Sequence, residues 1–235
     1  MTLHVESVTV VFGGVTAVSE VSLAAEPSHV TGLIGPNGAG KTTLFNVISG
    51  IITPGNGTVR LDGIDLTRMA PHRRARHGIA RTFQRLELFG SLSAAENVRV
   101  AAEVAGRPHA MDLAMELLER VGISEHARQP AGELDTGTAR LLEVARALAT
   151  SPRVLLLDEP ASGLDAGATE RLATLLRDLA ADGLAVLLVE HDVELVMGVC
   201  DRLFVLDLGR IIAGGPPDEV RRLPAVVEAY LGAGS

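Results

Sequence analysis

One stretch of the sequence has the residue types and spacing needed to hold a chain of phosphates. Residues 35–42 read GPNGAGKT and match the pattern GxxxxGK[ST] in full, after an apolar strand and at the start of a helix. Glycines let backbone N–H groups approach a phosphate, and the helix N-terminus adds positive potential. The pattern predicts a nucleotide site made by Gly35, Pro36, Asn37, Gly38, Ala39, Gly40, Lys41, Thr42 and Thr43.

Lys41 is the only lysine in a chain that has 20 arginines. A lysine ammonium is a compact, mobile point charge, whereas a guanidinium is a rigid planar fork. We therefore expect Lys41 to contact the β- and γ-phosphates of ATP. The hydroxyl of Thr42 is expected to hold Mg²⁺, so the loop predicts ATP and Mg²⁺ as cofactors.

A second motif places two carboxylates at the end of an apolar run. Residues 154–159 read VLLLDE, which puts Asp158 and Glu159 at the carboxyl end of a strand, where ligands of α/β folds bind. Taken alone, such a pair is more often an ordinary polar strand end. After a complete phosphate loop, Asp158 is expected to hold Mg²⁺ and Glu159 to polarise the attacking water as general base.

The elements that must position these residues alternate along the chain. Strands are expected at 3–12, 17–23, 30–34, 57–62, 153–157, 184–189 and 202–207, and helices at 41–49, 94–102, 108–121, 137–149, 167–181 and 193–199. Apolar strands alternating with helices predict an α/β fold with a largely parallel sheet covered on both faces. We expect one domain, 1–235, with its core in 1–84 and 152–235 and a helical insertion at about 85–151.

Composition excludes several classes of protein. The net charge of −8, without a basic tract, argues against nucleic acid or anionic lipid as the main partner. A single cysteine excludes an internal disulfide framework and a cysteine-rich zinc site. No apolar run reaches 18 residues and no secretory signal opens the chain, which predicts a cytosolic protein.

At this point nearly the whole chain resembles the ATP-binding subunit of an ABC transporter. Residues 160–165, PASGLD, resemble the segment after the catalytic carboxylate, and Asp165 takes the place of its aspartate. Residues 189–192, VEHD, resemble the switch-histidine region, which implies that His191 contacts the γ-phosphate and supports Glu159. A lone histidine is usually structural, but His191 closes a strand beside the phosphate loop.

Two further residues take roles from the resemblance. Residues 81–84, RTFQ, resemble the glutamine loop, so Gln84 would reach Mg²⁺ or water and sense the transport partner. Phe12 matches the aromatic residue that stacks on adenine, although a phenylalanine that ends a strand is more often part of a core. The family fold is a P-loop NTPase (RecA-like) core with an antiparallel β subdomain and an inserted helical subdomain.

Within the family, the chain is most similar to the branched-chain amino acid uptake ATPases. Residues 32–46, 81–97, 191–202 and 229–232 carry this likeness. It implies an ATPase that powers uptake of branched-chain or related amino acids through a membrane permease. The expected partners are that permease, docking near residues 86–92, a second ABC ATPase subunit in a head-to-tail dimer and, indirectly, a substrate-binding protein. The expected location is the cytoplasmic face of the membrane.

The family signature, Leu-Ser-Gly-Gly-Gln, is altered in this chain. Residues 134–138 are Leu134, Asp135, Thr136, Gly137 and Thr138, of which only Leu134 and Gly137 match. In the family this segment faces ATP on the other subunit, where an ionised Asp135 opposes the triphosphate by about 4 kcal/mol per charge pair at roughly 4 Å and a dielectric near 20. Alternatively, Asp135 N-caps the helix that follows. The altered signature favours a partner that is a different chain, while homodimer and heterodimer both stay open.

Other functional classes fit less well. An ABC ATPase of DNA maintenance needs a long coiled coil, and the 49 residues between Gln84 and Leu134 are too few for one. Translation-associated ABC proteins normally carry two cassettes, and this chain has one. An ATPase of another transport or envelope-export system, or a non-transport accessory ATPase, remains the alternative. The neighbouring genes, or a membrane pull-down, would discriminate between them.

Overall fold

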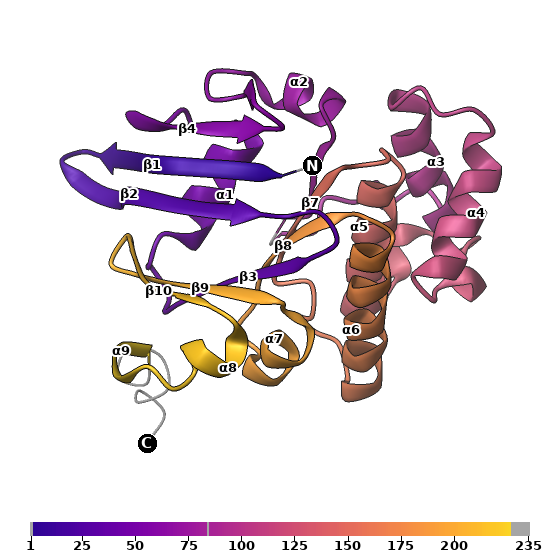
Figure 1. Cartoon of the computed structure of the whole chain (residues 1–235). Helices are drawn as coiled ribbons and strands as arrows, with labels where there is room; N and C mark the ends of the chain where they lie inside the picture. Colours follow the sequence, from indigo (N-terminus) through magenta and orange to yellow (C-terminus); the bar gives the residue numbers. More distant parts are fainter. Residues whose placement is uncertain (1, 84, 227–235) are drawn as a thin grey trace.

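The structure, a computed structural model, describes residues 2–83 and 85–226. Within that part of the chain, two β-sheets form the centre of the molecule (Figure 1). A six-stranded sheet has the order β10-β9-β3-β8-β7-β6, and a four-stranded sheet has the order β2-β1-β4-β5. The strands are β1 Leu3–Phe12, β2 Val15–Ala25, β3 Val30–Ile34, β4 Asn56–Leu61, β5 Ile64–Asp65, β6 Ile79–Arg81, β7 Val154–Asp158, β8 Ala185–Val189, β9 Arg202–Asp207 and β10 Arg210–Gly215.

The six-stranded sheet confirms the predicted parallel architecture. Its strands pair in parallel from β9 through β6, and only β10 runs antiparallel to its neighbour β9. Every residue of β3, β7 and β8 is buried, as expected for strands covered on both faces. The sequence prediction omitted β6 and β10, because β6 has only three residues and β10 contains two glycines.

Two hydrophobic cores lie on opposite faces of this sheet. Successive residues of a strand point to opposite faces, so Leu155 and Leu157 enter one core while Val154 and Leu156 enter the other. The first core is shared with the helices of residues 94–199, and the second with the four-stranded sheet and the helix after β3. The carboxyl ends of the parallel strands are thereby fixed from both sides.

The helices follow the predicted pattern with small shifts at their ends. The helices are α1 Lys41–Ser49, α2 Pro71–Arg76, α3 Ala94–Val104, α4 Ala110–Arg120, α5 Thr136–Leu148, α6 Ala166–Ala181, α7 Val193–Val199, α8 Pro217–Val220 and α9 Pro224–Val226, with short 3₁₀ turns at Ser124–His126 and Ala131–Glu133. Figure 1 shows α3 and α4 at one side of the molecule, with α5 and α6 between them and the sheet. The sequence prediction omitted α2, α8 and α9, which have six residues or fewer.

Helix α1, which follows the phosphate loop, is held at its far end by a buried arginine. Arg74 of α2 is 1% exposed, and its guanidinium donates to the carbonyl oxygens of Val47 and Ile48 at 2.6 and 2.8 Å. These carbonyls belong to the last turn of α1, where the regular helical hydrogen bonds end and the Gly50 N–H also donates to Val47. Further bonds from Arg74 to Met69 and Thr67 fix α2 against α1. The position of α1 is therefore set by residues 67–74.

Candidate nucleotide site

The phosphate loop has the tight backbone that the glycine pattern predicts. A Cβ on Gly35 would lie 2.0 Å from the Leu206 carbonyl oxygen, and one on Gly40 would lie 2.5 Å from that of Ala17. Gly40 also has a φ of 109°, in the region that favours glycine. The N–H of Gly209 donates to the Ala39 carbonyl at 2.9 Å, which ties the loop to the turn between β9 and β10. Both glycines are required by these close approaches.

Lys41 begins α1 and points into its own loop. Its Nζ donates to the carbonyl oxygens of Gly35 and Pro36 at 2.6 and 3.0 Å, and the residue is only 6% exposed. Burial lowers the pKa of Lys41, while the charges of Glu159 and Asp158 act in the opposite direction. The ammonium is thus held at the loop in the position where a phosphate chain would pass.

A hollow of about 200 Å³ lies over this loop. It brings together the loop and the two strand ends selected from the sequence. The lining residues are Ala17, Asn37, Gly38, Ala39, Gly40, Lys41, Thr42, Thr43, Glu159, Val189 and His191. Residues more than 100 positions apart in the chain therefore share one wall.

Glu159 and His191 contact each other across this hollow. The His191 Nε2 lies 2.8 Å from the Glu159 Oε1, and the two side chains are 41% and 21% exposed. Glu159 follows β7 directly and has a φ of 52°, unusual for a residue with a side chain. Its N–H donates to the Val189 carbonyl at 2.9 Å, which keeps the ends of β7 and β8 together. Contact between these residues is the arrangement implied by the family resemblance.

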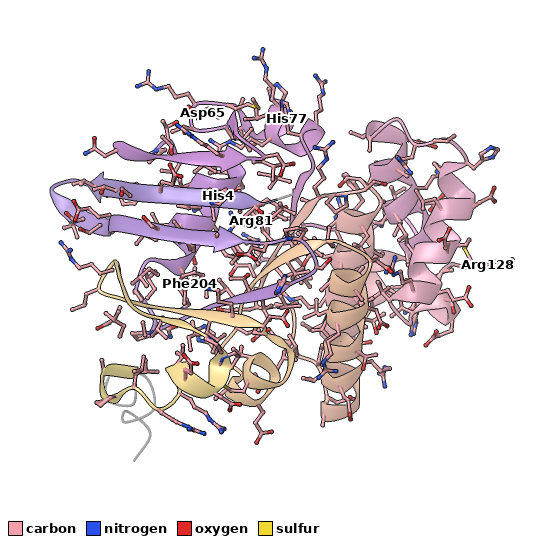
Figure 2. All side chains as sticks on the ribbon, in the orientation of Figure 1. His4, Asp65, His77, Arg81, Arg128 and Phe204 are labelled. Atoms are coloured by element: carbon pink, nitrogen blue, oxygen red, sulfur yellow. The ribbon has the colours of Figure 1, made fainter. Side chains whose placement is uncertain are left out.

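Asp158 is buried, is not among the residues that line the hollow, and is paired with an arginine that sequence reasoning did not select. The Arg81 Nη2 donates to the Asp158 Oδ2 at 3.0 Å, and the Arg81 side chain, labelled near the centre of the view in Figure 2, is buried. Arg81 also donates to Asn46 Oδ1 at 2.6 Å and to Ser49 Oγ at 3.1 Å. Burial raises the pKa of Asp158, and Arg81 opposes that shift. The only available signal was that a buried carboxylate needs a partner.

The remaining predicted site residues lie elsewhere. Asp165 N-caps α6, where its Oδ1 accepts from the Ala168 N–H at 2.7 Å. Phe12 is 50% exposed at the end of β1, so it is not a core residue, and the described wall of the hollow contains Ala17 from this sheet instead. Gln84 lies outside the described residues, so its predicted contacts stay a prediction.

The altered signature forms the start of α5. Asp135 is its N-cap: Oδ1 accepts from the Thr138 N–H at 2.9 Å and Oδ2 from the Thr138 hydroxyl at 2.6 Å. These bonds lower the pKa of Asp135. A Cβ on Gly137 would meet the Leu164 side chain at 3.0 Å, so the signature packs against the segment that follows Glu159. The predicted capping role of Asp135 is therefore present, and the Asp135 side chain is exposed to solvent.

Three buried or partly buried side chains of α5 contact the backbone at Phe83 and at Glu87, before and after Gln84. Arg140 Nη1 donates to the Phe83 carbonyl at 2.7 Å and to Glu143 Oε2 at 3.1 Å. The Glu87 N–H donates to Glu143 Oε1 at 3.0 Å, and Arg146 donates to the Glu87 carbonyl. The segment expected to dock on a permease is therefore fixed to α5.

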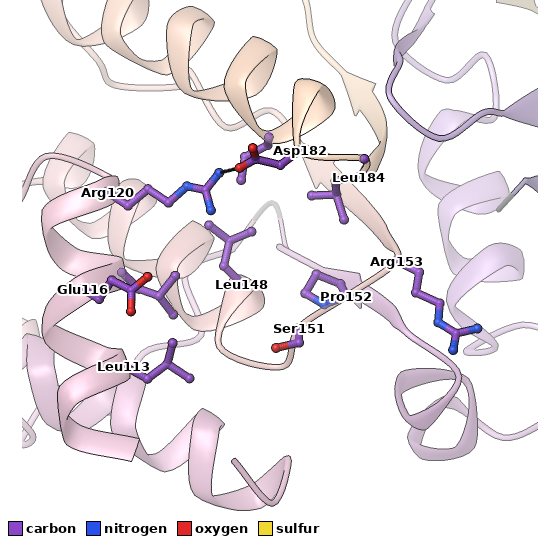
Figure 3. Close-up of a pocket in the computed structure, with 12 residues that line it drawn as sticks. Leu113, Glu116, Arg120, Leu148, Ser151, Pro152, Arg153, Asp182 and Leu184 are labelled. Atoms are coloured by element: carbon purple, nitrogen blue, oxygen red, sulfur yellow. Dashed lines mark hydrogen bonds and ion pairs between the residues drawn. The ribbon is translucent and has the colours of Figure 1, made fainter. Parts of the chain in front are cut away.

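A separate hollow of about 380 Å³ contains none of the predicted residues (Figure 3). It lies between α4, the loop before β7 and the loop before β8, and Leu148, Pro152 and Leu184 contribute to its walls. Arg120 of α4 and Asp182 form an ion pair across it. The hollow therefore lies between α4 and the amino ends of β7 and β8, whereas the phosphate-loop hollow lies at their carboxyl ends.

Among residues 2–83 and 85–226, no His, Cys, Asp and Glu side chains form a group of three or more that could hold a metal ion. In the same described part of the chain, no helix is long and apolar enough to cross a membrane.

Comparisons with known proteins agree with this geometry. The family model described as "ABC transporter" matches residues 18–162, and one described as "Branched-chain amino acid ATP-binding cassette transporter" matches residues 210–235. The chain is 41% identical to the high-affinity branched-chain amino acid transport ATP-binding protein BraF of Pseudomonas aeruginosa, covering 98% of this chain and 97% of BraF. It is 39% identical to LivG of Escherichia coli K12, with the same coverage.

Solved structures show the same fold. A nucleotide-free ATP-binding cassette from an ABC transporter superposes with a TM-score of 0.90 at 31% identity, covering 98% of this chain and 99% of that one. A dimeric post-hydrolysis cassette bound to ADP and phosphate gives 0.83 at 26% identity, covering 92% and 98%. The predicted fold class is therefore confirmed. The chain belongs to the ABC transporter family, as one of its ATP-binding cassettes.

Proposed function

We propose that this chain binds ATP with Mg²⁺ and hydrolyses it to ADP and phosphate. This reaction powers uptake of branched-chain or related amino acids through a membrane permease. One observation carries the hydrolytic part. Glu159 and His191 contact each other at 2.8 Å on the wall of the same hollow that Lys41 and the phosphate loop form. The proposed base Glu159, its partner His191 and the phosphate loop therefore line the same hollow.

The residues divide the chemistry between them. Lys41 and the loop N–H groups would bind the phosphates, and Thr42 and Asp158 would hold Mg²⁺, which would neutralise charge on the phosphate chain. Glu159 accepts a proton from the attacking water. With its proton on Nε2, His191 donates to Glu159 and orients the carboxylate. One carboxylate and one hydroxyl suit Mg²⁺, which keeps waters and takes phosphate oxygens as further ligands.

The partners follow from the position of the signature and of the segment held by α5. Asp135 and its neighbours would face ATP on a second cassette, and the dimer itself is supported by a similar cassette solved as a dimer with ADP and phosphate. The permease would dock near residues 86–92, where Phe89 is 50% exposed. A substrate-binding protein would act through the permease. Docking would place the chain at the cytoplasmic face of the membrane.

The substrate class is supported by sequence likeness along the whole chain. BraF and LivG are both named for branched-chain amino acid transport, and the match at residues 210–235 concerns the same transporters. Uptake of radiolabelled leucine, isoleucine and valine into cells lacking this gene tests the proposal. Wild-type chain should restore uptake and Lys41→Ala should not. Uptake that is unchanged by deletion, with ATPase activity intact, would redirect the search to another transported substrate.

A further inference from the structure

A buried carboxylate without an assigned role joins the two loops of the hydrolytic site. Glu190 follows β8 directly and is only 4% exposed. Its Oε1 accepts the Ala161 N–H at 2.7 Å, and its Oε2 accepts the His191 N–H at 3.0 Å. The N–H of Asp192 adds to the same interaction. One side chain therefore contacts both the segment after Glu159 and the segment that contains His191.

The choice of a carboxylate at this position has a physical reason. Burial of a carboxylate is unfavourable unless hydrogen bonds compensate for lost water. A carboxylate has acceptor sites on both oxygens, whereas an amide of the same shape has one acceptor oxygen and a donor nitrogen. Only the carboxylate satisfies N–H groups arriving from Ala161 and His191 at once. A side chain needed merely to fill space would not require two acceptors.

The tie made by Glu190 lies within a contiguous set of contacts. Glu159 N–H donates to Val189, so β7 and β8 are already joined by a backbone bond next to it. On the far side of Ala161, a Cβ on Gly163 would lie 2.9 Å from the Thr136 side chain. The signature, residues 161–164, Glu190 and His191 therefore touch in sequence. These contacts link the start of α5 to the backbone of His191.

On this geometry, we propose that Glu190 is a positioning residue for ATP hydrolysis. It holds His191 and Glu159 at their contact distance and ties both to residues 161–165, the segment that packs on the signature. This inference rests on the proposed function for its effect on turnover. Its structural content, that one carboxylate couples two loops, does not depend on hydrolysis and is measurable without nucleotide.

The first measurement is hydrogen exchange of the nucleotide-free chain, comparing wild type with Glu190→Gln. We expect faster exchange in residues 159–165, in 190–193 or in both, with residues 35–43 unchanged, because the amide satisfies one loop only. Glu194→Gln is the matched control, since Glu194 is exposed and near in sequence, and the charge change is the same. Wild-type exchange in both segments of Glu190→Gln would overturn the coupling.

The second measurement separates binding from turnover. Glu190→Gln should reduce kcat at least tenfold while the Kd for ATP, measured by calorimetry, stays within about threefold, because the phosphate loop is untouched. Glu194→Gln should match wild type in both. A wild-type kcat in Glu190→Gln would overturn the positioning role. If the wild-type assembly itself hydrolyses no ATP, the proposed function fails, and the exchange experiment still decides the coupling.

Glu190→Asp keeps the result interpretable if the glutamine variant melts early. Aspartate retains the charge but is shorter by one methylene, so it should keep the neighbouring His191 N–H and release that of Ala161. Exchange should then rise in residues 159–165 alone, and kcat should fall. An aspartate variant with wild-type exchange and kcat would contradict the proposal.

Discussion

The guanidinium of Arg81 and the carboxylate of Asp158 form a buried ion pair, 3.0 Å from Nη2 to Oδ2, with side chains 6% and 2% exposed. They end the neighbouring strands β6 and β7, which pair in parallel. Arg81 also lies over the rings of Phe45 and Phe83. It therefore fixes Asp158 relative to α1, the helix that begins with Lys41.

Loss of that arginine should destabilise the fold. Arg81→Met keeps much of the side-chain length but leaves Asp158 buried without its ion-pair partner, and breaking a buried pair costs about 3–5 kcal/mol. Urea denaturation should show a loss of that order. The double variant with Asp158→Asn should lose less than the two single changes together. Fully additive losses would mean that the pair is not energetically coupled.

Chemical labelling should report directly on Lys41. An amine-reactive ATP analogue has only Lys41 and the N-terminus to modify, and Mg-ATP should protect Lys41. Lys41→Ala should weaken ATP binding by about 10- to 100-fold, because a hydrogen bond to a charged group contributes about 1.5–3 kcal/mol. Lys41→Arg is the charge-matched comparison, and its rigid fork should also bind poorly. Unchanged calorimetric affinity in Lys41→Ala would contradict the phosphate assignment.

Replacement of the proposed base should separate chemistry from binding. Glu159→Gln should retain ATP affinity and a closed dimer, while turnover falls by about 10²- to 10⁴-fold, the usual contribution of general base catalysis. Glu170→Gln, at an exposed position on α6, provides the control for charge. Steady-state ATPase rates and size-exclusion chromatography with ATP measure both effects. A glutamine variant with normal turnover is the result that would remove Glu159 from this role.

Two substitutions at Asp135 should distinguish its capping from its charge. Asp135→Ser preserves a side-chain acceptor for the Thr138 N–H, whereas Asp135→Ala removes it, so only the alanine variant should lose about 1 kcal/mol of stability. In the assembled transporter, Asp135→Ser should raise nucleotide affinity or turnover at the partner's site because a negative charge is removed. No change there would refute the electrostatic effect and leave the cap as the role.

The single cysteine should make stability fall at high pH. Burial raises the pKa of Cys200 to about 12, above the ordinary thiol pKa of 9.0 that applies in the unfolded chain. Between these values the folded state binds the proton more tightly, so stability is complete below pH 9 and falls by about 1.4 kcal/mol per pH unit above it. Urea denaturation between pH 8 and 10.5 should show a steeper decline for wild type than for Cys200→Ala. Equal declines of stability with pH in wild type and Cys200→Ala would contradict a contribution from the Cys200 thiol.

Local features of this protein could be read from its sequence, whereas contacts across the fold could not, except the Glu159–His191 contact that the family resemblance implied. The phosphate loop and the cap of Asp135 depend on residues within a few positions, so their patterns are visible. The bonds from Arg81 to Asp158 and from Glu190 to Ala161 span 77 and 29 residues. Charged residues such as Arg81 and Glu190 are normally predicted to lie on the surface. Their partners come within hydrogen-bonding distance only because of the order of the strands in the folded sheet.

The hydrogen bonds from α5 to Phe83 and Glu87 affect how α5 and this loop can move. Helix α5 has 13 residues, a rod about 20 Å long, with Asp135 at one end and Arg140, Glu143 and Arg146 holding Phe83 and Glu87 along its side. A rigid rod fixed to a loop transmits tilt as well as translation. The backbone at Phe83 and Glu87 and the N-cap at Asp135 are therefore joined through one rigid helix, so a tilt of α5 would displace both.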